Sequence, residues 1–360
     1  MDQPSPVPAS RFPDHPTLAA RLPQVSLGCW PTPVERAAGL GRALGLSGLY
    51  LKRDDLSGER YGSNKVRKLE LLLGEAVQRG ASGVFTLGFA GSNHALATAL
   101  YARQLGLACT ALLMPQASAP YVRQNLLAGQ AAGARLIPCR NSLVLGLRYL
   151  QRQRTDYLIP AGGTCPLGVA AYVNAAFELR GQIQAGLLPE PDRIYVPFGS
   201  MGTTAGLSLG LQAAGLRTRI EAVRVIEPRW ASASGLKHLL RRSLALLRDL
   251  DPAFPQLQDL GANLNLRGDQ LGQGYAMPTA AGLAAEQLMH AHTGLRLNPT
   301  YSAKAFAALV ADARAGLLGG RTVLYWNTYN TRDLSSLIQG QDYHHLPEAF
   351  HRYFEAASPA

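Results

Sequence analysis

The sequence predicts an α/β fold in which mainly parallel strands are covered by helices on both faces. Short runs rich in β-branched and aromatic residues alternate along the chain with longer amphipathic stretches. Several of the short runs lead directly into glycine-rich loops, as strands do at the carboxyl edge of a parallel sheet. The length of 360 residues is enough for one large domain or two ordinary ones.

The alternation is clearest in the middle of the chain. There the pattern predicts three strands and two helices in turn, at 84–87, 92–105, 110–114, 121–132 and 134–138. It resumes with a strand at 194–198, a helix through Ala213, and strands at 220–226 and 322–326. The stretch 227–269 is polar and contains proline, which predicts one helix with long connections.

The composition disfavours several classes of protein. The net charge is +11, but Lys and Arg are spread along the chain, so we expect no nucleic-acid partner, although a positive field favours anionic ligands. The four cysteines form no C-x-x-C pair and have no histidine at a zinc-like spacing, which predicts no metal site and a reducing compartment. Neither a secretory signal nor a membrane span is recognisable, so we expect a cytoplasmic protein.

Three cations crowd the start of one predicted helix, in the segment Gly62-Ser63-Asn64-Lys65-Val66-Arg67-Lys68. Asn64, or Ser63 before it, is a typical N-cap. Lys65, Arg67 and Lys68 then lie in the first turn, where the helix dipole is positive and acidic residues are preferred. A bound anion such as a phosphate would remove this conflict, and a solvated basic turn is the alternative.

Two further glycine-rich segments each join a predicted strand to a predicted helix. In Gly88–His94 the helix start would offer backbone N–H groups to a carboxylate or phosphate, whereas Ser92 and Asn93 would also serve as simple capping residues. Gly199–Gly206 is typical of a phosphate-binding nest. A dinucleotide site with Glu227 as the ribose acid is the rival interpretation, but the glycine spacing is not that of G-x-G-x-x-G. A mononucleotide-sized phosphate therefore fits better.

Taken in order, these segments resemble the fold-type II pyridoxal-phosphate (PLP) enzymes, and among them the group of D-cysteine desulfhydrase and 1-aminocyclopropane-1-carboxylate (ACC) deaminase. The resemblance extends from about residue 31 to residue 330. It rests on an ordered set of motifs: Pro31-Thr32-Pro33, Leu51-Lys52-Arg53-Asp54-Asp55, the Lys65 segment through Glu70, Ser92-Asn93-His94, the Gly199 loop, Gly274-Tyr275, Asn298-Pro299-Thr300-Tyr301-Ser302-Ala303-Lys304, and the strand through Thr328.

The resemblance implies a two-domain, tryptophan synthase beta-like α/β architecture. Residues 1–67 and 179–360 would form the large PLP-binding domain, and residues 68–178 a small inserted α/β domain. The implied cofactor is pyridoxal 5'-phosphate, with Lys65 as its covalent attachment point. A lysine can play this part because burial and neighbouring cations destabilise its ammonium.

The resemblance also implies a role for each of the other site residues. Lys68 would approach the cofactor phosphate, Asn93 would bond the ring oxygen, and Thr328 would donate to the pyridine nitrogen. Three side chains would face the substrate: Ser92, Tyr275 and Tyr301. The phosphate itself would lie in a loop of five residues: Ser200, Met201, Gly202, Thr203 and Thr204.

Some positions depart from the family pattern. Gly91 stands where the family usually has Gln, Asn327 where it usually has His, and Tyr329-Asn330 where it usually has Gly-Gly. At two positions where the deaminase branch carries Glu and Leu, this chain has Ser302 and Thr328. In this it follows the desulfhydrase branch.

These observations predict an α,β-elimination on a small β-substituted amino acid, with D-cysteine as the best candidate. ACC deamination and a sulfo-lyase reaction on cysteate are alternatives within the family. The departure at Tyr329-Asn330 keeps open a PLP-binding protein without turnover. Beyond a small amino-acid substrate, the expected partner is a second copy of the chain in a homodimer.

Overall fold

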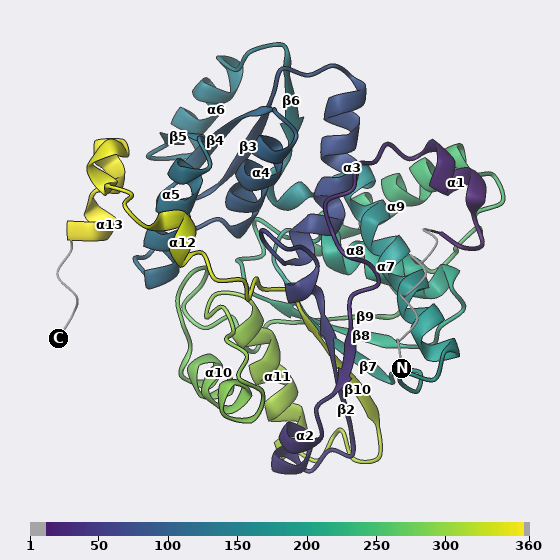
Figure 1. The fold of residues 1–360 in the computed structure, drawn as a ribbon. Coiled ribbons are helices and arrows are strands. Elements are labelled where there is room, and N and C mark those ends of the chain that lie inside the picture. Colours follow the sequence, from purple (N-terminus) through teal and green to yellow (C-terminus); the bar gives the residue numbers. More distant parts are fainter. Residues whose placement is uncertain (1–11, 356–360) are drawn as a thin grey trace, which may run out of the picture. The chain divides into compact units, whose positions relative to one another are not determined.

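The computed structural model describes residues 12–355, which form two compact units, each built on its own sheet (Figure 1). Among the described residues, the larger unit comprises 12–22, 28–68 and 165–331. The smaller unit comprises 23–27, 69–164 and 332–355. One helix, α3 (Asn64–Gln78), begins in the larger unit and continues into the smaller one.

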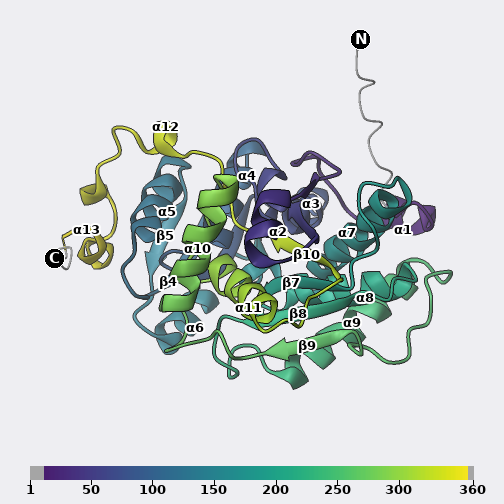
Figure 2. The ribbon, with the colours of Figure 1, turned by 90° about the horizontal axis from the view of Figure 1, so that it is seen from below.

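The larger unit is built on a six-stranded sheet in the order β1-β2-β10-β7-β8-β9. All neighbours run parallel except β1 and β2, which are antiparallel. Figure 2 shows β10, β7, β8 and β9 side by side in this order. The strands are β1 (Val34–Arg36), β2 (Gly48–Arg53), β7 (Arg193–Phe198), β8 (Arg219–Arg224), β9 (Leu264–Arg267) and β10 (Thr322–Asn327).

Helices cover both faces of this sheet, as burial of a parallel sheet requires. Figure 1 shows α10 and α11 on one side of it and α7 and α8 on the other. The helices of this unit, with its one 3-10 turn, are α1 (Pro16–Arg21), α2 (Ala38–Leu44), η1 (Asp54–Leu56), α7 (Pro166–Gln184), α8 (Gly202–Ala213), α9 (Ala233–Leu250), α10 (Ala280–Thr293) and α11 (Ser302–Arg314).

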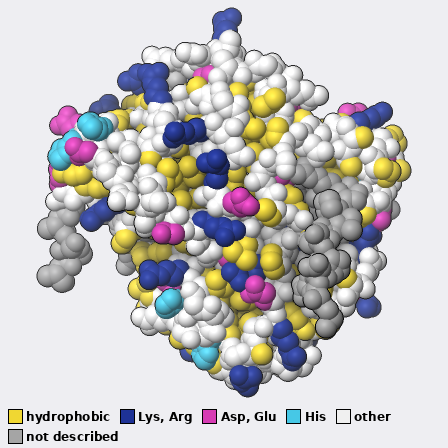
Figure 3. Space-filling view, in the orientation of Figure 1, with side chains coloured by type: hydrophobic (Ala, Val, Ile, Leu, Met, Phe, Trp, Pro, Cys, Tyr) yellow, Lys and Arg dark blue, Asp and Glu magenta, His cyan; other side chains and the backbone are white. Residues whose placement is uncertain are grey.

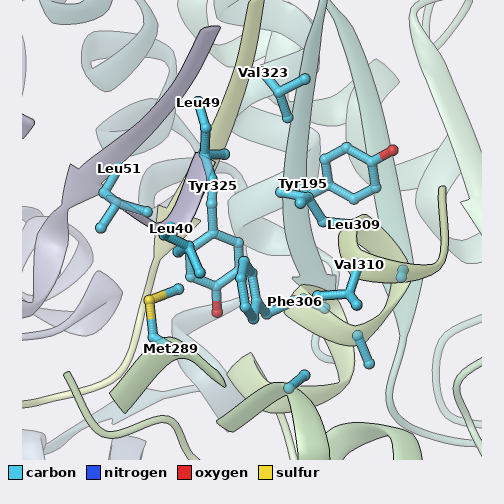
Figure 4. Close-up of a cluster of buried hydrophobic side chains, with 14 of the residues drawn as sticks. Leu40, Leu49, Leu51, Tyr195, Met289, Phe306, Leu309, Val310, Val323 and Tyr325 are labelled. Atoms are coloured by element: carbon cyan, nitrogen blue, oxygen red, sulfur yellow. The ribbon is translucent and has the colours of Figure 1, made fainter. Parts of the chain in front are cut away.

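The core under α11 joins β2, β10 and β7 through large buried side chains (Figure 4). Tyr195 and Tyr325 come from neighbouring strands and are fully buried, and the ring of Phe306 meets that of Tyr325 at 5.1 Å. The Tyr325 hydroxyl donates to the Ser302 carbonyl at 2.7 Å, which satisfies its only polar atom. This packing fixes the start of α11 against the middle of the sheet.

The smaller unit has a four-stranded, fully parallel sheet in the order β5-β4-β3-β6. α4 and α5 pack on one face together with the C-terminal segment, and α6 packs on the other. Its elements are β3 (Gly83–Phe89), α4 (Asn93–Gln104), β4 (Ala108–Met114), α5 (Pro120–Ala131), β5 (Arg135–Pro138), α6 (Ser142–Leu150), β6 (Asp156–Ile159), η2 (Ala161–Gly163), α12 (Ser335–Ile338), η3 (Tyr343–His345), η4 (Glu348–Phe350) and α13 (Arg352–Glu355).

The predicted α/β class with parallel strands is confirmed, and every strand predicted from the alternation is present within a few residues. The sequence pattern missed β1, β2, β6 and β9. β9 lies in the stretch for which one helix alone was predicted, because Leu264–Arg267 is short and half polar. β2 was noted only as a charged motif, since its Lys52 is a residue type rarely found in a buried strand.

The two units are bounded differently from the predicted domains in three places, the first of which is the short segment 23–27, expected in the large domain but part of the smaller unit. α7 belongs to the larger unit, although residues up to 178 were expected in the small domain. The reason is its contact with α8: a Cβ on Gly206 would lie 2.5 Å from the Val169 carbonyl, and one on Gly210 2.7 Å from that of Val173. The segment after 331 belongs to the smaller unit, where Leu346, Phe350 and Tyr353 pack against the α5 side of the core. Residues 1–11 and 356–360 lie outside the described part.

The surface carries dispersed charge. On the face shown in Figure 3, Lys and Arg side chains are interspersed with apolar and acidic ones. Among residues 12–355, no helix has the length and apolar composition that a membrane span needs. The same residues contain no group of three or more His, Cys, Asp or Glu side chains that could hold a metal ion.

A buried cluster of charges joins β2, α3 and α7 in the larger unit. Arg67 donates through Nε and Nη2 to Asp54 at 2.8–3.1 Å, and through Nη1 and Nη2 to Glu178 at 2.9 and 2.8 Å. Lys52 Nζ donates to Glu178 at 2.5 Å. The two cations and two carboxylates therefore balance. We call these four residues the charge quartet: Lys52, Asp54, Arg67 and Glu178.

Neighbouring side chains satisfy the rest of the quartet. Asp54 Oδ2 accepts from Trp326 Nε1 at 2.8 Å and from the Tyr172 hydroxyl at 2.5 Å. The Arg67 guanidinium lies 4.1 Å from the centre of the Trp30 ring. Burial alone would raise the pKa of Glu178, but the two cations hold that pKa at about 2.

We predict that Arg67→Met destabilises the protein by about 3–5 kcal/mol, because it leaves two carboxylates buried with a single cation. The exposed pair Arg79–Glu75 offers a matched control, and Arg79→Met should cost at most about 1 kcal/mol. Chemical unfolding at pH 7 measures both. The carboxylates' stabilising contribution is present above the ordinary pKa of 4.5 and is lost as the pH falls toward the folded pKa of about 2. The difference in the free energy of unfolding between Arg67→Met and the parent should therefore become smaller as the pH falls through that range. A difference that stays constant would contradict the ionic origin of the effect.

Candidate active site

The start of α3 is tied to the carboxyl ends of β7 and β10. The backbone N–H of Asn64 donates to the Thr328 carbonyl at 3.3 Å, and its side-chain Nδ2 donates to Thr203 Oγ1 at 3.0 Å. The N–H of Gly62 donates to Asn330 Oδ1 at 2.7 Å. The predicted phosphate loop, the Lys65 turn and Thr328 therefore meet in the larger unit, at the sheet edge where parallel α/β folds bind ligands.

Lys65 and Lys68 lie in the first turn of α3 with their ammonium groups taken out of water. Burial lowers the pKa of Lys65 to about 8. Lys68 is completely buried, and burial together with the nearby Lys65 lowers its pKa well below the ordinary value. The Tyr172 ring lies 5.9 Å from Lys68 Nζ and offers it a cation–π contact. A lysine with a depressed pKa presents a neutral amine more often, which suits covalent chemistry.

The structure shows that a bound anion is not the only way to stabilise the three cations at the start of α3. Arg67 is neutralised by Asp54 and Glu178, which the sequence analysis did not connect with it. Ser63 rather than Asn64 caps the helix, since its Oγ accepts from the Lys65 N–H at 3.1 Å. The Asn64 side chain is thereby free to bond Thr203.

The loop after β7 has the properties of an anion site. Met201, the N-cap of α8, makes no capping bond with its side chain and has the unusual φ of 71°. Thr204 Oγ1 is buried without a hydrogen-bond partner among the described residues. The uncapped N–H groups of a helix start and an unsatisfied buried hydroxyl both suit a phosphate. The residues at Ser200–Thr204 therefore fit the phosphate group of the implied cofactor.

Two tyrosines from different segments form a hydroxyl pair. The hydroxyls of Tyr275 and Tyr301 bond each other, and their rings meet edge to face at 5.8 Å. Both side chains are partly exposed. Ser302, which follows Tyr301, is completely buried, and its hydroxyl accepts from the Asn298 N–H at 2.7 Å. The pair is thus a polar feature in reach of a ligand, whereas Ser302 serves its own loop.

Ser92, Asn93 and Gly91 lie in the smaller unit at the start of α4. Ser92 caps this helix, its Oγ accepting from the Ala95 N–H at 3.1 Å, and Asn93 Oδ1 accepts from Asn125 Nδ2 at 2.9 Å. A Cβ on Gly91 would lie 3.0 Å from Gln116 Nε2. In this chain, the side chain of Gln116 therefore occupies space next to position 91, where the family usually carries a glutamine.

In the larger unit, the contacts of two charged residues near Tyr275, Lys304 and Glu227, were not predicted from the sequence. Lys304 in α11 is completely buried, and its Nζ donates to the carbonyls of Leu271 and Gly274. Burial lowers its pKa to about 8 against the opposing attraction of Glu227. Glu227, considered above as a ribose acid, accepts from the Tyr275 N–H at 3.3 Å instead. These contacts link segments that are distant in the sequence, so the sequence did not predict them. The only available signal was that Lys304 and Gly274-Tyr275 both lie in motifs of the family resemblance.

Comparison with known proteins decides among these interpretations. Residues 25–328 match the family described as pyridoxal-phosphate dependent enzymes. The chain belongs to this family. The predicted family and the predicted cofactor, PLP, are therefore confirmed.

Three similar proteins show the range of the enzyme's relatives. A nocardicin C-9' epimerase from Nocardia uniformis is 34% identical, covering 88% of this chain and 95% of its own length. A D-cysteine desulfhydrase from Serratia proteamaculans is 33% identical, covering 81% and 88%. A crystal structure of an ACC deaminase homologue superposes with a TM-score of 0.74 at 30% identity, covering 92% and 99%. The similar proteins thus include a desulfhydrase and a homologue of a deaminase.

We predict that the PLP-loaded enzyme is yellow and that Lys65→Ala abolishes its visible absorption band and its turnover. The reason is that Lys65 is the proposed covalent attachment point. Lys237→Ala, at an exposed lysine of α9, should keep both. Absorption and far-ultraviolet circular dichroism, recorded together, separate loss of the cofactor bond from loss of the fold. An unchanged band in folded Lys65→Ala would contradict the assignment.

We predict that Thr203→Ala and Lys68→Ala weaken cofactor binding more than they slow the chemical step. Each removes a contact expected at the phosphate, and a bond to a charged group is worth about 1.5–3 kcal/mol, or roughly ten- to a hundredfold in affinity. Thr218→Ala is the control, because Thr218 is also buried and lies beyond the opposite end of α8 from the loop. PLP titration of the cofactor-free proteins measures the effect. Parent-like affinity in both variants would place the phosphate elsewhere.

Proposed function

We propose that the enzyme is a PLP-dependent lyase that eliminates the β-substituent of a small amino acid, with D-cysteine as the best candidate. The products would be sulfide, ammonia and pyruvate. The observation that carries this choice is the environment of Tyr301. Where the deaminase branch has Glu, this chain has Ser302, whose hydroxyl is buried and bonded to the Asn298 N–H.

The cofactor side of the site is proposed as follows. Bound PLP supplies an electron sink for negative charge at the substrate Cα. Lys65 holds the cofactor, and its Nζ takes the Cα proton, a role supported by its pKa of about 8. Lys68 and residues 200–204 hold the phosphate, and Asn93 bonds the ring oxygen. Thr328, whose hydroxyl is a neutral donor, bonds the pyridine nitrogen without protonating it.

The substrate side is proposed to comprise Ser92, Tyr275 and Tyr301. The hydroxyl pair of the two tyrosines supports this proposal, because each hydroxyl is both donor and acceptor. Together they can orient a substrate group and exchange a proton with it.

The chemistry of the leaving group favours elimination over ring opening. A thiolate or sulfite leaves as a stable anion once Lys65 has taken the Cα proton. A cyclopropane has no such group, so its opening needs further acid, base or nucleophile support. Ser302 is too weak an acid to give this near pH 7, and its hydroxyl is already occupied. Cysteate, with sulfite as the leaving group, remains an alternative substrate on the same grounds.

Epimerisation at Cα is a second candidate, supported by the similarity to nocardicin C-9' epimerase. Both reactions begin with removal of the Cα proton. They differ in whether the β-substituent leaves or a proton returns to Cα from the other face.

A cytoplasmic, homodimeric enzyme is also part of the proposal. The four cysteines are free, as is usual in a reducing compartment. The homodimer follows from the resemblance alone, and sedimentation of the PLP-loaded enzyme tests it.

We predict measurable pyruvate from D-cysteine or a β-substituted relative, and little or no 2-oxobutanoate from ACC. The assay compares keto-acid release from both compounds and from the L-enantiomers at one enzyme concentration. Solvent deuterium at Cα of recovered substrate, without keto acid, would indicate the epimerase instead. Preferential turnover of ACC would overturn the proposal. Inertness toward every compound in both assays would favour the PLP-binding protein without turnover.

A further inference from the structure

The first turn of α11 contacts the segment that carries Tyr275 at two separate points. Tyr301, immediately before the helix, bonds the Tyr275 hydroxyl. Lys304, three residues further along, reaches the backbone of the same segment, where Nζ donates to the Leu271 carbonyl at 2.8 Å and the Gly274 carbonyl at 3.0 Å. One helical turn therefore fixes both the hydroxyl of Tyr275 and the backbone just before it.

Glu227, after β8, completes this attachment from the other side. Its Oε1 accepts from the Tyr275 N–H at 3.3 Å, and its charge attracts the Lys304 ammonium. Gly274 has a φ of 132°, and a Cβ there would lie 2.6 Å from Glu227 Oε1. Ala276 has a φ of 59°, which is unusual for a residue with a side chain. The backbone on both sides of Tyr275 is thus held in an uncommon conformation by its neighbours.

Burial of Lys304 in the first turn of α11 costs free energy that other contacts must offset. A buried ammonium loses its hydration, and a cation in the first turn of a helix opposes the helix dipole. The two carbonyl acceptors and Glu227 offset this cost, and all three belong to the Tyr275 attachment. A local rule broken at such a place is typical of a functional constraint.

We propose that Lys304 is a positioning residue for the reaction: it fixes the Leu271–Gly274 backbone so that the Tyr275 hydroxyl meets that of Tyr301 where the substrate binds. This inference rests on the proposed function, in which the two tyrosines face the substrate. Lys304 itself contacts neither the substrate nor the cofactor in this proposal.

The test compares Lys304→Met in the PLP-loaded enzyme with the parent, with Lys304→Arg and with the exposed-site control Lys237→Met. We expect kcat for keto-acid release from D-cysteine, or the best substrate of the panel, to fall about ten- to a hundredfold in Lys304→Met, because a small misplacement of a substrate-positioning group has this effect. KM, the visible absorption band and the affinity for PLP should change little. Lys304→Arg should recover part of kcat, and Lys237→Met all of it.

Hydrogen exchange gives a readout that does not depend on turnover. Peptides covering residues 268–277 should exchange faster in Lys304→Met, while those covering the phosphate loop keep the parent rate. Parent-like kcat or parent-like exchange at 268–277 in Lys304→Met would overturn the proposal. If this variant does not fold, Glu227→Gln replaces it, with the same expected pattern and the same contrary result.

The double variant Lys304→Met/Tyr275→Phe separates this inference from the proposed function. If Lys304 acts through Tyr275, the double variant should be no slower than Tyr275→Phe alone. Multiplied losses would overturn the positioning role while leaving the proposed function intact. A parent-like Tyr275→Phe would instead remove Tyr275 from the proposed substrate site, and the positioning proposal with it.

Discussion

The bidentate hold of Asp54 and Glu178 on Arg67 is the interaction on which the rest of the larger unit depends. Asp54 follows β2, Glu178 lies in the middle of α7, and Arg67 belongs to the same helical turn as Lys65. One guanidinium therefore fixes the height and rotation of the α3 start relative to a strand and a helix that are remote in sequence. Arginine suits this role because its planar fork keeps its charge and engages two carboxylates at once. A lysine at position 67 would give a point charge without the same geometry.

The quartet also sets the electrical environment of the turn. Because Arg67 is paired with two carboxylates, its charge adds little to the field at Lys65, and burial is what lowers the pKa of that lysine. Tyr172 connects the two regions, since its hydroxyl donates to Asp54 while its ring lies beside Lys68. The Asn64 side chain then links the turn to Thr203 in the phosphate loop. The proposed attachment lysine and the proposed phosphate loop are therefore connected through contacts among neutral or paired groups.

Residues close in sequence revealed most of what could be predicted. The alternation of apolar runs and glycine loops identified six of the parallel strands, and the cations at 65, 67 and 68 identified an unusual helix start. The pairing of Arg67 with Glu178 could not be predicted, because 111 residues separate them and nothing in the sequence around Glu178 indicates a partner for it. β2 was missed as a strand because its buried Lys52 is satisfied only by α7 and by the Thr32 carbonyl. The roles of Lys304 and Glu227 depend in the same way on a fold that brings distant loops together.

The bond between the Gly62 N–H and Asn330 Oδ1 joins residues 268 positions apart. This bond lies at the start of the segment that carries Lys65. Two residues further along, the Asn64 N–H donates to the Thr328 carbonyl. Both partners directly follow β10, the last strand of the larger sheet along the chain, which lies between β2 and β7. During synthesis, the turn that carries Lys65 thus lacks these two supports until residues 328 and 330 have been made. A truncated chain that stops before β10 would therefore leave Lys65, the proposed attachment point, without the contacts that hold its turn in place.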